Sequence, residues 1–312
     1  MKILIFCDSP FLGDNIRLFN LITTLQASIE DCDLWYLGSN QFNPIPGVLK
    51  DYNIKIQTLP MTIKNFGSEW EHILKARAEV KKTQKKDFDL VIHLGSNFKQ
   101  TMVLRQIPSR YFYASTWGFL FCSRWGKYQK TKNDPTVIAS NLAYMLNRKI
   151  PITPYSIKRI DERLYQEAKK LLPKDNYVGF AITQGHPTRK KTWSLDHFIH
   201  IANEVSFRGD QPVFLVERSH QDVIKTIKKE VPGALFPELE SSHACPALVT
   251  TLALRMKMAI SIDCGVMHMI GLANIPMIVL FGPTSAEKFA PRIDQIQVLE
   301  SQVLYQSPDI DK

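Results

Sequence analysis

The 312-residue sequence predicts an α/β protein made of two Rossmann-like halves, each built on a parallel β-sheet. Short apolar runs alternate with segments whose apolar residues recur at helical spacing, a pattern typical of β-α units. The alternation breaks at prolines and polar residues near 150–158 and then restarts. The length fits two domains of about 150 residues each. We therefore expect domains at 1–155 and 156–312 that face each other across a cleft.

The first half has its clearest strands at 2–7 and 88–94, two continuous apolar runs of which the second ends at Gly95. A helix follows the first strand, because one set of apolar residues recurs at helical spacing: Leu18, Leu21, Ile22, Leu25 and Ile29. The other elements expected here are strands at 33–38, 54–59 and 109–113 and helices at 68–86 and 136–148. Residues 114–132 are irregular, aromatic and basic.

The second half repeats the alternation. Ser194 is a candidate N-cap for a helix whose apolar residues share one face. The elements expected here are strands at 177–183, 213–217, 258–262 and 277–281 and helices at 160–172, 194–205, 220–230, 246–256 and 265–273. The segment after Thr284 shows no strong helical pattern.

The composition narrows the class of protein. A hydrophobic content of 45% supports two full-sized cores and argues against global disorder. No apolar run approaches the roughly 20 residues that a membrane-spanning helix needs. The five cysteines are scattered without a Cys-x-x-Cys pair, which disfavours a zinc site and a disulfide framework and favours a reducing cytoplasm.

The net charge of +9 is concentrated in the first half, where residues 1–155 hold 20 Lys and Arg against 12 Asp and Glu. This excess predicts an anionic partner for the first domain, or else only a solvated face. Within 114–132, basic and aromatic residues alternate in a way that suits an aromatic floor with cationic clamps: Arg124, Lys127, Lys130 and Lys132 with Trp117, Phe119, Trp125 and Tyr128. No nucleic-acid-binding motif is present, and the charge does not follow one helix, so nucleic acid is disfavoured as the partner.

Gly13 and Asp14 follow the first strand, at the turn into the first helix. Gly13 permits a tight turn, and Asp14 then faces the expected cleft as either a helix cap or a catalytic base. The absence of Gly-x-Gly-x-x-Gly disfavours a dinucleotide site there.

The loop at 185–193 carries Thr188, a basic run ending at Lys191, and Trp193, just before a helix. Such a loop suits a diphosphate, because a helix N-terminus and basic side chains both attract negative charge. The alternative is a surface loop, with Trp193 covering a core edge.

Residues 258–284 combine a strand, the sequence Asp263-Cys264-Gly265, a small-residue helix with His268, and a strand ending in Phe281-Gly-Pro-Thr284. The strand-turn-helix opening leaves backbone N–H groups free to seat a phosphate. Taken singly, Asp263 could cap its helix and His268 could be an interior histidine.

Together these motifs resemble glycosyltransferase family 9, the bacterial lipopolysaccharide heptosyltransferases, which have a GT-B fold. The matching sequences are Gly13-Asp14, Lys191-Thr-Trp193, Asp263-x-Gly265-x-x-His268 and Phe281-Gly-Pro-Thr284. They stand in the family's order, and the resemblance is strongest at 1–25 and 177–284. The chain departs from the family at His186-Pro187 and at Glu217–Gln221, where Gly-x-x-x-Glu is usual, so the residue that would contact the donor ribose is unplaced.

The resemblance implies an inverting transfer of a sugar, heptose from ADP-heptose in this family, with no metal or other cofactor. Asp14 is then the catalytic base, and the donor-binding residues are Gly13, Thr188, Lys191, Asp263, Cys264, Gly265 and His268. The basic first domain fits an anionic, lipid-linked core glycan as acceptor, held by Arg124 and Lys127, and peripheral association with the inner membrane. The alternative is a non-catalytic protein on the same fold that binds sugar nucleotides or glycans, with Asp14 only a cap.

Overall fold

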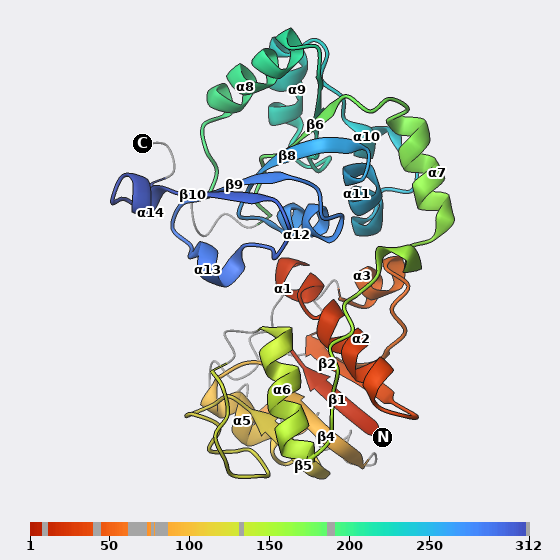
Figure 1. Cartoon of the computed structure of the whole chain (residues 1–312), viewed down its shortest axis with the longest axis vertical. Helices are drawn as coiled ribbons and strands as arrows, with labels where there is room; N and C mark the ends of the chain where they lie inside the picture. Colours follow the sequence, from red (N-terminus) through yellow and green to blue (C-terminus); the bar gives the residue numbers. More distant parts are fainter. Residues whose placement is uncertain are drawn as a thin grey trace. The chain divides into compact units, whose positions relative to one another are not determined.

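The chain forms two compact units in a computed structural model that describes residues 1–7, 12–39, 45–61, 74–75, 78, 87–130, 134–185 and 191–309 (Figure 1). Unit 1 comprises residues 1–50 and 54–156, and unit 2 comprises residues 51–53 and 157–312. Each unit has its own sheet and its own core.

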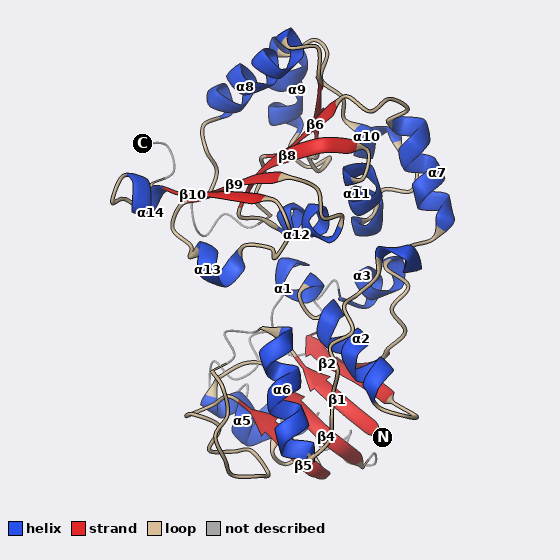
Figure 2. Ribbon diagram, viewed as in Figure 1, coloured by secondary structure: helices blue, strands red, loops and turns tan. Residues whose placement is uncertain are grey.

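Unit 1 is built on a five-stranded parallel sheet in the order β3-β2-β1-β4-β5 (Figure 2). Its strands are β1 (Lys2–Phe6), β2 (Asp33–Ser39), β3 (Gln57–Met61), β4 (Phe88–His93) and β5 (Ser109–Ala114). Its helices are α1 (Leu12–Ile16), α2 (Phe19–Ser28), α3 (Ile45–Asp51), α5 (Phe98–Leu104) and α6 (Pro135–Leu146).

The sequence of unit 1 explains its central elements. The apolar residues of β1 are fully buried between β2 and β4, as expected of a strand with helices on both faces of its sheet. Helix α6 begins with Asp134, whose side chain accepts a hydrogen bond from the Thr136 N–H, and with Pro135 at its first position. It ends at Asn147 in the left-handed conformation (φ 51°).

Unit 2 contains a second five-stranded parallel sheet in the order β10-β9-β8-β6-β7. Its strands are β6 (Tyr177–Ala181), β7 (Gln211–Phe214), β8 (Met256–Ile262), β9 (Met277–Phe281) and β10 (Ile296–Glu300). Its helices are η1 (Ile157–Arg159), α7 (Glu162–Leu171), α8 (Leu195–Phe207), α9 (Gln221–Glu230), α10 (Pro237–Glu240), α11 (Pro246–Ala253), α12 (Gly265–Leu272), α13 (Ala286–Phe289) and α14 (Ser301–Leu304). Helices α8 and α9 lie on one side of this sheet, and α7, α11 and α12 lie on the other (Figure 2).

The two sheets share one strand order. Val213 of β7 forms a parallel bridge to Leu235, which acts as a minimal further strand beyond β7. Counting it, unit 2 follows the order 3-2-1-4-5-6, and unit 1 follows 3-2-1-4-5. The strand order reverses between β1 and β4 in unit 1 and between β6 and β8 in unit 2, and ligands of such sheets bind at the carboxyl ends of strands at that point. The α/β class and the parallel sheet in each half are confirmed.

Several boundaries differ from the sequence prediction. The strand expected at 54–59 lies at Gln57–Met61, because α3, which was not predicted, runs to Asp51 and is closed by a hydrogen bond from the Ile54 N–H to the Leu49 carbonyl. Strand β10 was missed because it is a half-buried edge strand without a continuous apolar run. Most of the helix expected at 68–86 falls outside the described residues. Ser194 occupies the N-cap position of α8, as predicted, although its side chain makes no capping hydrogen bond.

Candidate donor site

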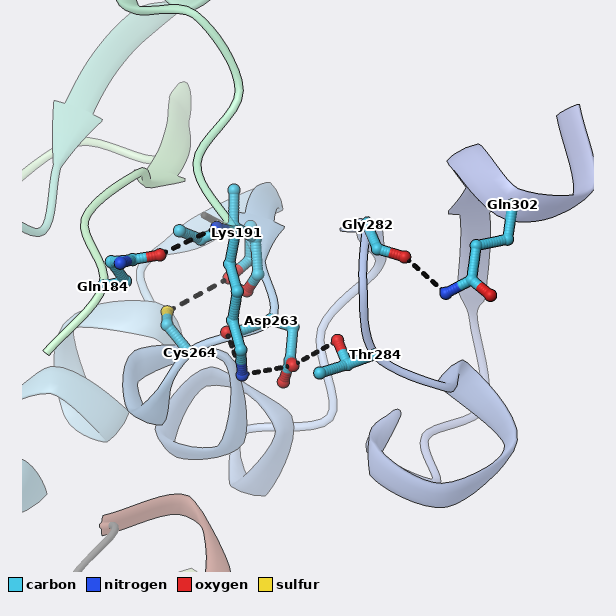
Figure 3. A network of polar contacts seen from close by, with 9 residues as sticks. Gln184, Lys191, Asp263, Cys264, Gly282, Thr284 and Gln302 are labelled. Atoms are coloured by element: carbon cyan, nitrogen blue, oxygen red, sulfur yellow. Dashed lines mark hydrogen bonds and ion pairs between the residues drawn. The ribbon is translucent and has the colours of Figure 1, made fainter. Parts of the chain in front are cut away.

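A polar network lies at the point where the strand order of unit 2 reverses (Figure 3). Lys191 Nζ lies 2.7 Å from Asp263 Oδ2, and Thr284 Oγ1 donates to the same oxygen at 2.6 Å. Lys191 comes from the loop after β6, Asp263 follows β8, and Thr284 follows β9. Three of the four sequence motifs therefore converge on one carboxylate.

Asp263 is held at the start of α12 rather than capping it. The N-cap position belongs to Cys264, and the Asp263 carboxylate turns instead to Lys191 and Thr284. Only 6% of Asp263 is exposed. A buried carboxylate needs a cation and hydrogen-bond donors to offset its lost hydration, and these two side chains supply both. The interpretation of Asp263 as a helix cap is therefore wrong.

Hydrogen bonds hold both the backbone and the side chain of Lys191. Its backbone N–H donates to Gln184 Oε1 at 2.8 Å, so one hydrogen bond joins the two ends of the loop at 185–190. Its side chain, 27% exposed, reaches Asp263 (Figure 3). Two residues later, the Trp193 ring packs edge-on against Phe198 and covers the core of unit 2, as one of the sequence alternatives proposed.

Contacts of Phe281 and Gly282 also hold the first half of the Phe281-Gly-Pro-Thr284 loop in place. Phe281 is fully buried at the end of β9, and the Gly282 carbonyl accepts a hydrogen bond from Gln302 Nε2 at 2.7 Å (Figure 3). Thr284 is 5% exposed. Gln184 and Gln302 belong to no motif and were missed. For Gln184 the available signal was its place at the end of a predicted strand, whereas Gln302 lies in a segment without a readable pattern.

The beginning of α12 adds the electrostatics of a helix N-terminus. Gly265 is the first helical residue, and the N–H groups of this turn have no partner within the helix. Burial raises the pKa of the Cys264 thiol, so the side chain beside this turn stays uncharged at neutral pH. His268 lies one turn further on and is buried, 8% exposed, in the body of α12.

The arrangement is suited to an anion. A lysine has three N–H donors, and the described contacts of Lys191 Nζ are the Asp263 carboxylate at 2.7 Å and its carbonyl at 3.5 Å. At least one donor therefore remains for a ligand, next to the partial positive charge of the helix start. A negatively charged group at this place would gain both interactions.

A pair of carboxylates lies near the end of β7. Glu217 follows β7, and Glu238 lies in α10, just after the bridge residue Leu235. Burial raises the pKa of Glu238 to about 7, with the charge of Glu217 as the second cause. At neutral pH Glu238 is therefore only partly ionised.

The remaining predicted residues are dispersed. Gly13 and Asp14 lie in the five-residue helix α1 after β1; the Asp14 side chain and Thr188 fall outside the described residues. Arg124 is exposed and already engaged, because its Nη1 donates to the Tyr144 carbonyl at 2.8 Å and its guanidinium lies over the Tyr144 ring. Lys127 is exposed nearby in sequence.

The aromatic floor expected at 114–132 is only half present. Phe119 is buried and stacks on Tyr128, and both rings contact Tyr113 in the core of unit 1. Trp117 and Trp125 are exposed instead. The prediction failed for Phe119 and Tyr128 because the sequence does not show which aromatic side chains of an irregular segment point into the core.

Unit 1 carries an uncharged histidine at the corresponding edge of its sheet. His93, at the end of β4, is 1% exposed. Its Nε2 donates to Gln100 Oε1 at 3.2 Å, and its Nδ1 lies 3.0 Å from Thr101 Oγ1, which contacts Thr116 Oγ1 at 2.6 Å. Burial lowers the pKa of His93 to about 4.

Comparisons with known proteins identify the family and the fold. Residues 77–312 match the model of glycosyltransferase family 9 (heptosyltransferase). A search of curated proteins found no match. Among solved structures, a family 9 glycosyltransferase from Veillonella parvula DSM 2008 superposes with a TM-score of 0.72 at 17% identity, covering 96% of this chain and 87% of that one.

Two further structures come from E. coli. Heptosyltransferase WaaC with ADP-2-deoxy-2-fluoro heptose gives a TM-score of 0.69 at 17% identity, with 96% of this chain and 93% of that chain covered. ADP-heptose LPS heptosyltransferase II gives 0.66 at 16% identity, with 99% and 95% covered. These likenesses establish a GT-B heptosyltransferase fold. Because the family match spans most of the sequence, the chain belongs to glycosyltransferase family 9, the heptosyltransferases, and is a glycosyltransferase.

Proposed function

We propose that the protein is an inverting, metal-independent glycosyltransferase that moves heptose from ADP-heptose onto an acidic acceptor of the lipopolysaccharide-core type. The observation that carries the proposal is the convergence of Lys191, Asp263 and Thr284 at the start of α12. This is where a parallel sheet of this order binds ligands. The complex of WaaC with an ADP-heptose analogue supports the choice of donor.

In the proposed reaction an acceptor hydroxyl attacks the anomeric carbon of the donor from the face opposite the diphosphate. The new carbon–oxygen bond forms as the bond to the diphosphate oxygen breaks, and the bonding electrons leave with the diphosphate. Lys191 and the N–H groups at Gly265 stabilise the negative charge that develops there. Unit 2, which comprises residues 51–53 and 157–312, is thus the proposed donor domain.

Asp14 takes the proton that the acceptor hydroxyl loses, because a neutral hydroxyl is a weak nucleophile without a base. Its place supports the role, since α1 follows β1 at the carboxyl edge of the unit 1 sheet. Gly13, next to it in the first turn of α1, is small enough to let a ligand approach the backbone. Unit 1, which comprises residues 1–50 and 54–156, is on this account the acceptor domain.

Arg124 and Lys127 are proposed to contact the acceptor. Both are exposed and lie in a stretch rich in cations. An acceptor with a carboxylate or phosphate would gain charge-assisted hydrogen bonds from them. Reversing both charges is expected to raise the acceptor KM and to leave the donor KM near the parent value, and this effect should shrink in salt because exposed charges are screened.

No metal and no further cofactor take part in the proposed reaction. The lysine and the helix start replace the divalent cation that other sugar transferases use to neutralise a diphosphate. Thr188, Cys264 and His268 complete the proposed donor site, as the family motifs imply.

The proposed location is the cytoplasm, at the inner face of the membrane where a lipid-linked acceptor would be exposed. Within the part of the chain that the structure describes, no helix has the length and apolar character to cross a bilayer.

The test is a two-step donor screen. Thermal shift with ADP-, GDP- and UDP-sugars should raise the unfolding temperature most with the ADP-sugar, because a ligand stabilises the state that it binds. Transfer to a lipid-free core fragment is then followed by mass spectrometry, with product stereochemistry by NMR. Stabilisation without transfer under any acceptor condition would favour a binding protein, and a stronger shift with a UDP- or GDP-sugar would overturn the choice of nucleotide.

A further inference from the structure

The loop between β5 and α6 of unit 1 is drawn in Figure 1. Three of its large apolar side chains are exposed to solvent. Trp125 is 81% exposed, Trp117 65% and Leu120 50%. We call residues 115–130 the tryptophan loop. Leaving two indoles and a leucine in water costs free energy, so their exposure on a soluble surface indicates an interaction site.

The backbone of this loop fixes Trp117 outward. Trp117, Gly118 and Phe119 are consecutive residues with φ of 48°, 67° and 70°. Bulky side chains rarely adopt this left-handed conformation, which persists only where the surrounding structure enforces it. The turn sends Phe119 into the core and leaves Trp117 outside, stacked on Phe98 with ring centroids 4.3 Å apart.

The tryptophan loop is also tied to the sheet. The Ser123 N–H donates to the Phe112 carbonyl at 2.9 Å, and the Phe112 N–H donates to Ser123 Oγ at 2.7 Å. Both bonds run along β5, the edge strand of the sheet. The exposed side chains therefore stand on an anchored platform, and binding through them orders little additional chain.

The charged side chains of the tryptophan loop itself have one sign. From Leu90 to Asn133 the sequence contains seven Lys and Arg and no Asp or Glu. Arg124, Lys127 and Lys130 lie within the tryptophan loop and are exposed. Indoles beside lysine and arginine are the combination that binds at the headgroup level of a membrane, where aromatic rings enter the interface and cations meet anionic lipids.

We propose that the tryptophan loop docks unit 1 onto the surface of an anionic phospholipid bilayer, with Trp117, Leu120 and Trp125 entering the headgroup layer. A free glycan or a nucleic acid would use the cations and a ring face but gives no reason to expose Leu120. The reason for docking, a lipid-linked acceptor, rests on the proposed function, whereas the binding itself does not depend on it.

The test measures binding of the full chain to vesicles by co-sedimentation. Vesicles of phosphatidylethanolamine with phosphatidylglycerol should bind the parent, and phosphatidylcholine vesicles should bind it weakly, with the difference shrinking as salt rises. The variant Trp117→Ser/Leu120→Ser/Trp125→Ser should lose about tenfold or more in partitioning, equivalent to about 1.4 kcal/mol. The control is Phe207→Ser in unit 2, where an 88% exposed ring lies outside the loop and its removal should change nothing.

ADP affinity and unfolding temperature confirm that each variant is folded. If the triple variant is not folded, the single variant Trp125→Ser, at the most exposed of the three positions, replaces it in the binding measurement. Equal partitioning of the parent, the loop variants and Phe207→Ser would overturn the inference. So would poor transfer to a lipid-free acceptor fragment by a loop variant, because Trp117, Leu120 or Trp125 would then act on the glycan rather than on the bilayer. If the parent binds vesicles but transfers no sugar, the proposed function fails and the docking stands.

Discussion

The two units use one strand order to present opposite chemistries at the same position. In unit 2, the residues after β6 and β8 are a partly exposed lysine and a buried carboxylate in contact, and Thr284 donates a hydrogen bond to the carboxylate. In unit 1, the corresponding edge holds His93 in uncharged form among hydroxyl and amide groups. The scaffold fixes where a ligand is bound, and the side chains at that edge decide which ligand it is.

The difference indicates a division of labour. A buried ion pair is costly to form, so its presence at a ligand-binding edge points to a role in binding charge. The corresponding edge of unit 1 holds the uncharged His93, and exposed cations of unit 1 lie in the tryptophan loop. A charged ligand group is therefore expected to meet the Lys191–Asp263 pair in unit 2 and the exposed cations of this loop in unit 1.

The largest effect expected is on transfer when Asp14 of unit 1 is changed. Asp14→Asn keeps the size of the side chain but removes the base, so kcat for transfer should fall by about 100-fold or more. Donor affinity should stay at the parent value, because the donor belongs to unit 2. Steady-state kinetics with a lipid-free acceptor measure both, and activity within a few-fold of the parent would leave Asp14 a helix cap.

The next largest effect is that of pH on folding stability, to which the two units should respond in opposite directions. Because the pKa of His93 falls from 6.5 to about 4 on folding, the unfolded chain binds more protons between those values, and stability is lost as pH falls through that window. This change can reach about 3 kcal/mol. Because the pKa of Glu238 rises from 4.5 to about 7, the native state binds more protons there, and stability is lost as pH rises from about 4.5 to about 7.

Thermal unfolding between pH 4 and pH 8 measures both responses. Glu238→Gln should remove the loss at rising pH and leave the acid response, whereas His93→Gln should remove the acid response. A pH profile that neither variant alters would show that neither group titrates abnormally in the folded protein.

A smaller effect is expected when the network of unit 2 loses one hydroxyl. Thr284→Val keeps the shape but removes the donor to Asp263 Oδ2, and a hydrogen bond to a charged group contributes about 1.5–3 kcal/mol. ADP affinity should fall by roughly tenfold, because the carboxylate then pulls harder on Lys191. Thr284→Ser is the matched control and should bind ADP like the parent. Equal affinities for the valine and serine variants would separate Thr284 from the site.

Removal of divalent cations is expected to have no effect on the transfer rate. Transfer should persist in excess EDTA, because Lys191 and the start of α12 neutralise the leaving diphosphate. The assay compares initial rates with EDTA and with EDTA followed by excess Mg²⁺. Activity that disappears in chelator and returns with the cation would remove the stated reason for the ion pair in unit 2.

The sequence predicted the strands of the two sheets better than it predicted the contacts between side chains. Buried parallel strands such as β1 and β8 are continuous apolar runs, so periodicity located them, whereas the edge strand β10 has no such run. The motifs identified Lys191 and Asp263 singly. Their contact depends on the strand order, which places β6 beside β8 although 74 residues separate Ala181 from Met256 between these strands.

The sequence did not predict which aromatic side chains point into the core and which point into solvent. Nothing in the pattern of 114–132 distinguishes Phe119, which is buried, from Trp117, which is exposed, because the choice follows from three successive left-handed residues. Gln184 was missed for a related reason. It acts on the backbone of Lys191, and such a role leaves no motif.

The central claim is that Lys191 of unit 2 binds the donor diphosphate, whereas Asp14 of unit 1 supplies the base. Calorimetric titration of ADP into the parent, Lys191→Ala and Asp14→Asn tests it most directly. Loss of a charge-assisted phosphate contact, about 1.5–3 kcal/mol, should weaken ADP binding to Lys191→Ala by about tenfold or more. Binding to Asp14→Asn should match the parent. Unchanged affinity in Lys191→Ala, or a comparable loss in Asp14→Asn, would contradict the division of labour between the two units.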